Sequence, residues 1–143
     1  MDIAGVLNQY RDGSITLESA VKKLSNRRER LPVERESVTK KIHLGDLEGY
    51  VIVGLYPDGR PGELFLTFDK IGSAERGWAY ALALIISLAL QVGLPIKAIA
   101  GKLRGVKFEP AGFTGDPQIR SADSVVDFLS QWLAARFPDG VAE

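Results

Sequence analysis

The chain of 143 residues contains no cysteine and a single histidine, His43. The lack of cysteine excludes disulfide bonds, thiolate metal sites, thiyl radicals and cysteine nucleophiles. One histidine cannot supply a multi-histidine metal site or a histidine relay. A charge bias is also lacking, because 18 Lys and Arg balance 18 Asp and Glu, so no overall field attracts nucleic acid or an anionic membrane. We therefore predict no metal, no cofactor and no specific nucleic-acid partner.

We expect no secretory signal, because the first 14 residues have no basic segment followed by an apolar one. Its longest uncharged run, the twenty residues 77–96, is close to the length that spans a bilayer. Ser87, Gln91, Gly93 and Pro95 interrupt this run, and no basic cluster flanks it. We expect a buried central helix, no membrane partner and a cytoplasmic location.

The patterns that are present divide the chain into two parts. Residues 1–31 predict an N-terminal helical arm with two short helices, at 2–11 and 14–29. Pro32 then breaks the helical pattern. Residues 32–143 predict a separate α+β domain.

Three segments of this domain are rich in β-branched and aromatic residues and alternate apolar with polar positions, as strands do: 37–45, 48–56 and 62–70. The stretches LGDLEG and PDGRPG between them contain the glycine, proline and aspartate that tight reversals need. The pattern predicts an antiparallel meander.

The remainder of the domain reads as helical. A long apolar helix is expected from a cap at Ser73 to about Val92, followed by a helix that starts near Pro95 and a last helix capped by Ser121. The predicted fold class is α+β: a three-stranded antiparallel meander packed against the long apolar helix and two further helices, all on one face of the sheet. The residues of the long helix expected to be buried are Leu82, Ile85, Ile86 and Leu90.

The segment 107–117, KFEPAGFTGDP, is the strongest candidate for a site. Its backbone N–H groups, with basic side chains beside them, can form an anion nest, and its phenylalanines can stack on a base. The alternative is that its phenylalanines and prolines fill the gap between helices and sheet. The residues predicted to contact a nucleotide-type ligand here are Arg104, Lys107, Phe108, Gly112, Phe113, Thr114 and Gly115.

Two further places are candidates for ligand contact. At the start of the long helix, Ser73, Arg76 and Trp78 combine free N–H groups, a positive charge and a flat ring, which suits a phosphate. The alternative is that Ser73 only caps the helix and Arg76 pairs with a nearby carboxylate. Arg60, at the tip of YPDGRPG, either reaches a ligand or a neighbouring chain, or belongs to a simple hairpin turn.

The evidence for catalysis in the sequence is weaker than the evidence for binding. Asp69, Glu75, Glu109 and Asp116 lie near these loops, but no two of them share a spacing that specifies a reaction. Ser73 has no base linked to it by a motif. We therefore predict a protein that binds and is not an enzyme.

Three stretches carry a resemblance to a known family: KFEPAGFTG at 107–115, GLYPDGRPGELF at 54–65 and SLALQVGLP at 87–95. With their surroundings, roughly residues 28–137, they resemble the C-terminal accessory region of adenosylcobalamin-dependent (class II) ribonucleotide reductases. The barrel that carries that family's radical-forming cysteines and cobalamin site has no counterpart in this sequence, nor does its cysteine-rich tail. The resemblance therefore implies the fold of a detached accessory module and no reductase activity.

Two functions follow as hypotheses. In the first, the chain is a non-catalytic module that binds a nucleotide or a nucleotide-derived signalling molecule, as a sequestering protein of a phage or mobile element would. In the second, it is an accessory or regulatory subunit that binds a separately encoded reductase catalytic chain. In both, we expect a homo-oligomer, a dimer or larger, because the long helix has more apolar surface than a three-stranded sheet can cover.

Overall fold

The computed structural model describes residues 3–25 and 28–138, and the chain divides into two compact units, 1–30 and 31–143. The smaller unit is a pair of helices, α1 (Ile3–Arg11) and α2 (Leu17–Ser25), that pack against each other. Their contact buries Val6 and Ala20. Larger apolar residues of the pair remain exposed: Ile3, Leu7, Tyr10, Leu17 and Val21.

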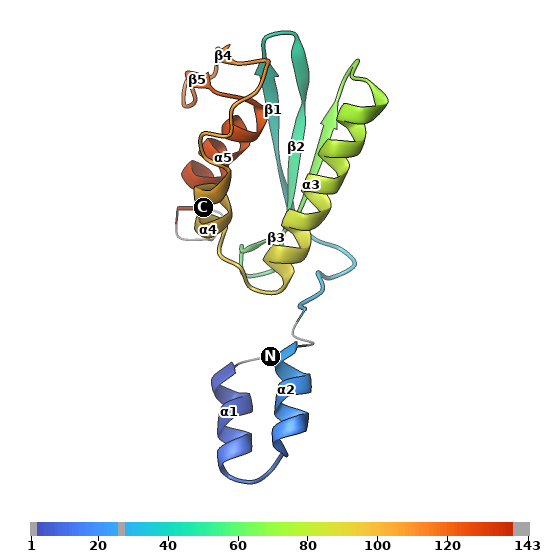
Figure 1. Ribbon diagram of the computed structural model, residues 1–143, viewed down its shortest axis with the longest axis vertical. Helices are drawn as coiled ribbons and strands as arrows, with labels where there is room; N and C mark the ends of the chain where they lie inside the picture. Colours follow the sequence, from blue (N-terminus) through green and yellow to red (C-terminus); the bar gives the residue numbers. More distant parts are fainter. Residues whose placement is uncertain (1–2, 26–27, 139–143) are drawn as a thin grey trace. The chain divides into compact units, whose positions relative to one another are not determined.

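The larger unit is built on a three-stranded antiparallel sheet in the order β1-β2-β3, as Figure 1 shows. Its strands are β1 (Ser37–Leu44), β2 (Leu47–Leu55) and β3 (Pro61–Phe68). The meander predicted from the alternating pattern is therefore confirmed.

The register of the strands sorts the side chains onto two different faces of the sheet. One face belongs to the core, and its buried residues include Ile42, Leu44, Val51, Val53 and Leu64. The other face is exposed and carries Lys41, His43, Tyr50, Phe65 and Thr67. All helices of the larger unit that share the core therefore lie on the first face, as predicted.

The long helix α3 (Ser73–Gln91) packs along β3. Two polar side chains in its apolar stretch, Ser87 and Gln91, form hydrogen bonds to this strand. The Ser87 hydroxyl accepts a hydrogen bond from the Leu64 backbone N–H at 2.8 Å, and the Gln91 amide donates to the Gly62 carbonyl at 3.0 Å. These side chains satisfy backbone groups of an edge strand that would otherwise need another strand.

The burial predicted for α3 is correct in part. Ile86 and Leu90 are buried and Leu82 is partly buried, but Ile85 is 62% exposed. The prediction for Ile85 was wrong because the helix is apolar on every side, so periodicity could not identify the inner face.

The ends of α3 also differ in how well they were predicted. The N-cap is Gly72, so Ser73 is the first helical residue and not the cap. At the other end Gly93 has φ of +93°, and the N–H groups of Gly93 and Leu94 donate to the carbonyls of Leu90 and Ala89. This is a Schellman motif, in which glycine tolerates the left-handed conformation.

The rest of the unit is helical with one small hairpin. Helices α4 (Ile96–Leu103) and α5 (Val125–Arg136) pack against each other, and the strands β4 (Gly112–Phe113) and β5 (Ser121–Ala122) pair between them in sequence. Phe128, Leu129, Trp132 and Leu133 of α5 complete the core. The α+β class is confirmed, and within the described residues no helix is long and apolar enough to cross a membrane.

The hydroxyl of Ser87 offers a test of the contact between α3 and β3. Ser87→Ala leaves the buried N–H of Leu64 without its partner, so we expect the free energy of unfolding to fall by about 1–3 kcal/mol. Urea denaturation at pH 7 measures this loss. The exposed Ser73→Ala is the control and should change stability by less than about 0.5 kcal/mol; equal losses in the two variants would contradict the assignment.

Candidate functional site

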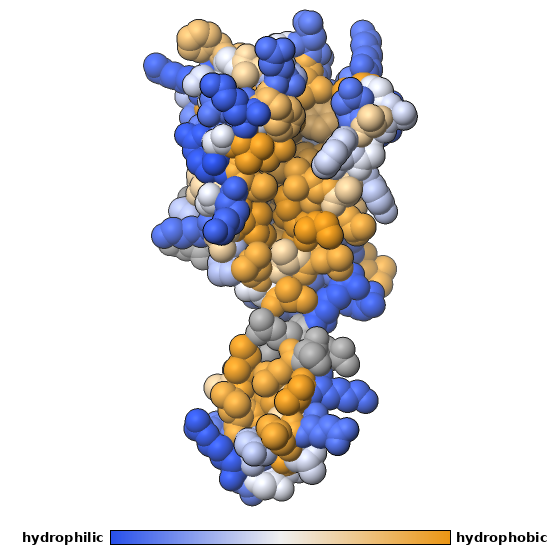
Figure 2. Space-filling view, in the orientation of Figure 1, coloured by the Kyte–Doolittle hydropathy of each residue, from blue (hydrophilic) through white to orange (hydrophobic). Residues whose placement is uncertain are grey.

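An apolar groove of about 590 Å³ opens in the larger unit between the first half of α3 and the segment that follows α4. Figure 2 shows hydrophobic residues gathered over this region. Trp78 and Leu82 of α3 line one side, and Val106 and Phe108 line the other. The groove is also lined by residues of β3 and α5: Leu66, Phe68, Val125, Val126 and Leu129.

The charges at the groove are of one sign. Among the described residues that line it, the only charged ones are Glu75 and Glu109. Trp78 is 78% exposed and Phe108 45% exposed, so both rings present large apolar surface to solvent. A groove of this size, with apolar walls and few polar groups, suits an apolar ligand or side chains of another protein.

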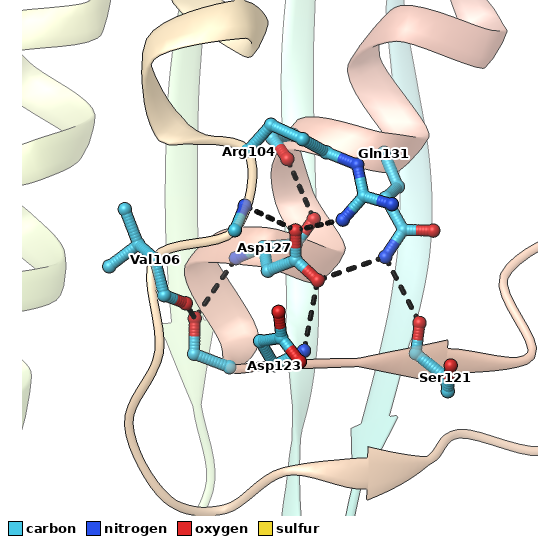
Figure 3. A network of polar contacts seen from close by, with 9 residues as sticks. Arg104, Val106, Ser121, Asp123, Asp127 and Gln131 are labelled. Atoms are coloured by element: carbon cyan, nitrogen blue, oxygen red, sulfur yellow. Dashed lines mark hydrogen bonds and ion pairs between the residues drawn. The ribbon is translucent and has the colours of Figure 1, made fainter.

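The segment 104–110, which carries the groove-lining Val106 and Phe108, is held in place by a buried carboxylate, Asp127 in the first turn of α5 (Figure 3). Its side chain is only 2% exposed and accepts four hydrogen bonds. The donors are the Arg104 guanidinium, the Gly105 N–H at 2.8 Å, the Asp123 N–H at 2.9 Å and the Gln131 amide at 3.0 Å.

This network explains the protonation state of Asp127. Burial by itself would raise the pKa of the carboxyl, but the backbone N–H groups of Asp123 and Gly105 and the Arg104 guanidinium outweigh it, so its pKa lies below the ordinary value. A carboxylate has about four lone-pair positions, and all of them are used here. Asp127 therefore acts as a structural anion and cannot serve as a general base.

The residues predicted around segment 107–117 are placed in two different environments. Arg104 is bound to Asp127 and lines a polar cleft with Arg120 and Gln118, whereas Phe108 lines the apolar groove. Lys107 lies between them in sequence and is exposed. Arg104 and Phe108 thus face different cavities, and one small ligand in either cavity does not meet both.

The glycine-rich part of the segment forms the β4–β5 hairpin. Gly112 pairs with Ala122, and Phe113 is 87% exposed. Thr114 is buried, its N–H donates to the Arg120 carbonyl at 2.9 Å, and its hydroxyl donates to the Ile119 carbonyl. The Thr114 N–H is therefore already used, while contact of Gly112 and Gly115 with a phosphate stays a prediction.

The other predicted residues fall partly at the groove. Trp78 lines it together with Phe108, so two places predicted separately meet at one site. Ser73 and Arg76 lie next to it on the outside of the first turns of α3. Arg60 is not among the described residues lining the groove; its guanidinium lies 4.6 Å from the centre of the Tyr56 ring and pairs with Asp58, as a hairpin-turn residue would.

Sequence reasoning missed Asp127 and assigned the helix cap wrongly. We expected Ser121 to cap the last helix, but Ser124 is the cap, and its hydroxyl accepts from the Asp127 N–H at 3.0 Å. The signal was present, because Ser124 and Asp127 have the spacing of a capping box. No cluster of three or more metal-ligating side chains occurs in the described part of the chain.

The comparisons with known proteins identify the family. The TSCPD domain model matches residues 13–137. The chain belongs to the TSCPD domain family. The resemblance seen in the sequence is confirmed, because the domain matches C-terminal portions of vitamin B12-dependent ribonucleotide reductases.

Three reductases illustrate the similarity of this TSCPD domain. The chain is 46% identical to the vitamin B12-dependent ribonucleotide reductase of Rhodopirellula baltica over 114 residues, which is 80% of this chain and 11% of the reductase. Identity is 40% over 110 residues with that of Streptantibioticus cattleyicolor (77% and 18%), and 36% over 115 residues with that of Agrobacterium fabrum (80% and 9%). The chain thus spans less than a fifth of these relatives, and no solved structure gives a significant match.

The Asp127 network predicts a specific dependence of stability on pH. Since the folded-state pKa of Asp127 is lower than the unfolded value of about 3.9, its contribution is complete above that value and is lost as the pH falls through the folded-state pKa. Asp127→Asn places an amide among four donors, so we expect unfolding free energy at pH 7 to drop by about 3 kcal/mol.

Urea denaturation at pH 7 and at pH 3 checks both parts of this prediction. The variant should lose less stability between the two pH values than the wild type does, because the titrating group is gone. Asp46→Asn, in an exposed turn, is the matched control and should leave stability at pH 7 within about 0.5 kcal/mol. A wild-type pH dependence retained in full by Asp127→Asn would refute the assignment.

Proposed function

We propose that this TSCPD domain is a non-catalytic accessory module of ribonucleotide reduction that binds the catalytic chain of a vitamin B12-dependent ribonucleotide reductase. The observation that carries the proposal is the groove of about 590 Å³, whose walls are apolar and whose aromatic residues Trp78 and Phe108 are exposed. The relatives support the proposed partner, because the chain matches only about a tenth of the Rhodopirellula baltica reductase. The rest of such a protein is a natural binding partner for the matched part.

Binding suits the carboxylates near the site better than catalysis does. Asp127 is filled by four donors. Burial would raise the pKa of Asp116, but the Lys40 ammonium and the N–H groups of Gln118 and Ile119 lower it below the ordinary value. Both groups are therefore stable anions that organise the loop, whereas a general base would need a pKa nearer to the working pH.

The charge at the groove favours a segment of protein over a phosphate. Glu75 and Glu109 would repel an anion, and they would attract Lys or Arg side chains beside an apolar segment. We therefore propose that the groove accepts apolar side chains of the reductase from a segment flanked by basic residues. Exposed aromatic residues in such grooves often supply much of the binding energy.

This proposal predicts that Trp78 is important for binding and not for stability. Trp78→Ala should weaken binding to a purified full-length B12-dependent reductase by about 10- to 100-fold, the effect of losing about 1.4–2.8 kcal/mol. Because the ring is 78% exposed in the free chain, the melting temperature should change little. Biolayer interferometry with immobilised reductase, that of Rhodopirellula baltica first, measures the affinity.

The matched control is Tyr50→Ala, which removes an exposed ring from the opposite face of the sheet. It should bind the reductase with unchanged affinity. No binding by the wild type at tens of micromolar, or equal loss in the two variants, would remove the support for an accessory role at this groove.

A nucleotide-type ligand is a second candidate, and one observation favours it. Phe108, predicted to stack on a base, and Trp78, predicted as a flat ring beside a phosphate, line the same groove. Lys107 is adjacent to Phe108 and exposed, so it is the residue best placed to meet a phosphate. In this case the chain would act by holding or sequestering the nucleotide.

Calorimetric titration with nucleoside triphosphates and cyclic nucleotides tests this second candidate. Lys107→Ala should weaken binding by about tenfold or more, because one charge-assisted contact is lost. Arg104→Ala is a poorer variant, since it also removes a donor from the buried Asp127. Lack of heat with every nucleotide, or wild-type affinity in Lys107→Ala, would argue against the candidate.

A further inference from the structure

The outer side of α3 is a continuous apolar surface that the groove does not include. After Arg76 the helix carries no charged residue up to its end at Gln91. Tyr80, Leu84 and Ile85 are 70%, 46% and 62% exposed and are not among the residues that line the groove. They lie away from Ala83, Ile86 and Leu90, which face the core.

The size of this surface is comparable with that of a protein interface. From Gly77 to Val92 it extends for about 22 Å at the rise of an α-helix. Trp78, at its edge, and Tyr80 together expose on the order of 300 Å² of side chain. With Leu84, Ile85 and Val92 added, the exposed apolar area is a large part of the roughly 800 Å² that each partner buries in a standard interface.

The charge pattern of α3 indicates which partner fits. An uncharged surface can pack against a second copy of itself without repulsion between like charges. Two grooves that faced each other would instead bring the carboxylates of both copies together. If two copies of α3 pack antiparallel, Arg76 in the first turn of one helix lies next to the last turn of the other helix. That last turn has no basic residue of its own, and a helix C-terminus favours a cation.

The small residues of the same surface would allow a second helix to pack closely against α3. Gly77 lies inside the helix, although glycine there is less favourable than alanine by about 1 kcal/mol of intrinsic propensity. A Cβ added at Gly77 would meet no atom within 4 Å, so packing within the described chain does not require glycine at this position. Ala81, one turn further on, is also small and exposed.

From these observations we infer that a second copy of this chain covers the outer side of α3, through an antiparallel α3–α3 pair related by a two-fold axis. The surface runs from Gly77 to Val92, so its midpoint, at Leu84 and Ile85, lies next to the axis. This assembly does not rest on the proposed binding of a reductase, because its central residues, Leu84 and Ile85, do not line the groove, and only Trp78 borders both surfaces.

The mass in solution tests the assembly first. Light scattering at 50 µM should give twice the chain mass of 15.6 kDa. Ile85→Glu should shift the protein to a monomer, with at least a 100-fold weaker dimerisation constant, because two carboxylates would meet at the axis. Since Ile85 is exposed in the single chain, circular dichroism and the melting curve should show that the variant still folds.

The matched control is Phe65→Glu, which makes the same kind of change at a 49% exposed residue on the outer face of the sheet. It should remain a dimer. A wild-type monomer at 50 µM, a dimer that Ile85→Glu does not weaken, or a dimer that Phe65→Glu weakens as much would each overturn the inference.

A cysteine introduced near the axis tests the geometry, because the natural chain has none. A disulfide needs Cα atoms within about 7 Å of each other, which two symmetry-related residues at the axis satisfy. Leu84→Cys or Ile85→Cys should therefore form a reducible dimer under mild oxidation much faster than Thr67→Cys on the exposed face of the sheet. Equal rates for all three variants would exclude this α3–α3 arrangement.

Discussion

The larger unit depends on one buried charge, the carboxylate of Asp127. It receives hydrogen bonds from the end of α4, from the residue before the cap of α5 and from the next turn of α5. A single anion thus holds the two ends of a connection of about twenty residues that contains both the β4–β5 hairpin and one wall of the groove. Such a connection has no regular structure long enough to position itself, so fixing its ends limits the conformations open to the segment between them. Asp116 with Lys40 adds a second fixed point, which ties the hairpin loop to β1.

The fold was accessible from the sequence because local signals agreed with one another. Strand alternation, the turn residues and Gly93 each pointed to the elements that the structure contains. Ser87 and Gln91 are instructive, because they argued against a membrane helix in the sequence and are the residues that bind the edge of β3 in the structure. In α3, these polar residues mark the side of an otherwise apolar helix that faces the backbone N–H and C=O groups of the edge strand.

The site was less accessible, and the reasons are physical. The sequence pattern could not predict whether Ile85 faces the core or the solvent, because a helix that is apolar on every side has no distinct inner face. Arg104 was predicted as a phosphate ligand from its position beside a glycine-rich loop, but its main partner, Asp127, lies 23 residues later in the chain. A pairing of this sequence separation is a tertiary event that no local pattern contains. The meeting of Trp78 and Phe108 in one groove is of the same kind.

The composition of α3 makes sense once its sides are considered separately. One side packs in the core, one binds the edge of β3, one lines the groove, and one faces solvent in the single chain. A helix of a monomer would gain solubility from charges on the last two sides at no cost to packing. In α3 these sides carry Trp78, Tyr80, Leu84 and Ile85 instead. Large apolar residues at such positions are favoured when another surface covers them, and this is the reason for the proposal that α3 contacts other protein chains. In that proposal, the two carboxylates that line the groove favour a basic partner there and leave the uncharged side of the helix for self-association.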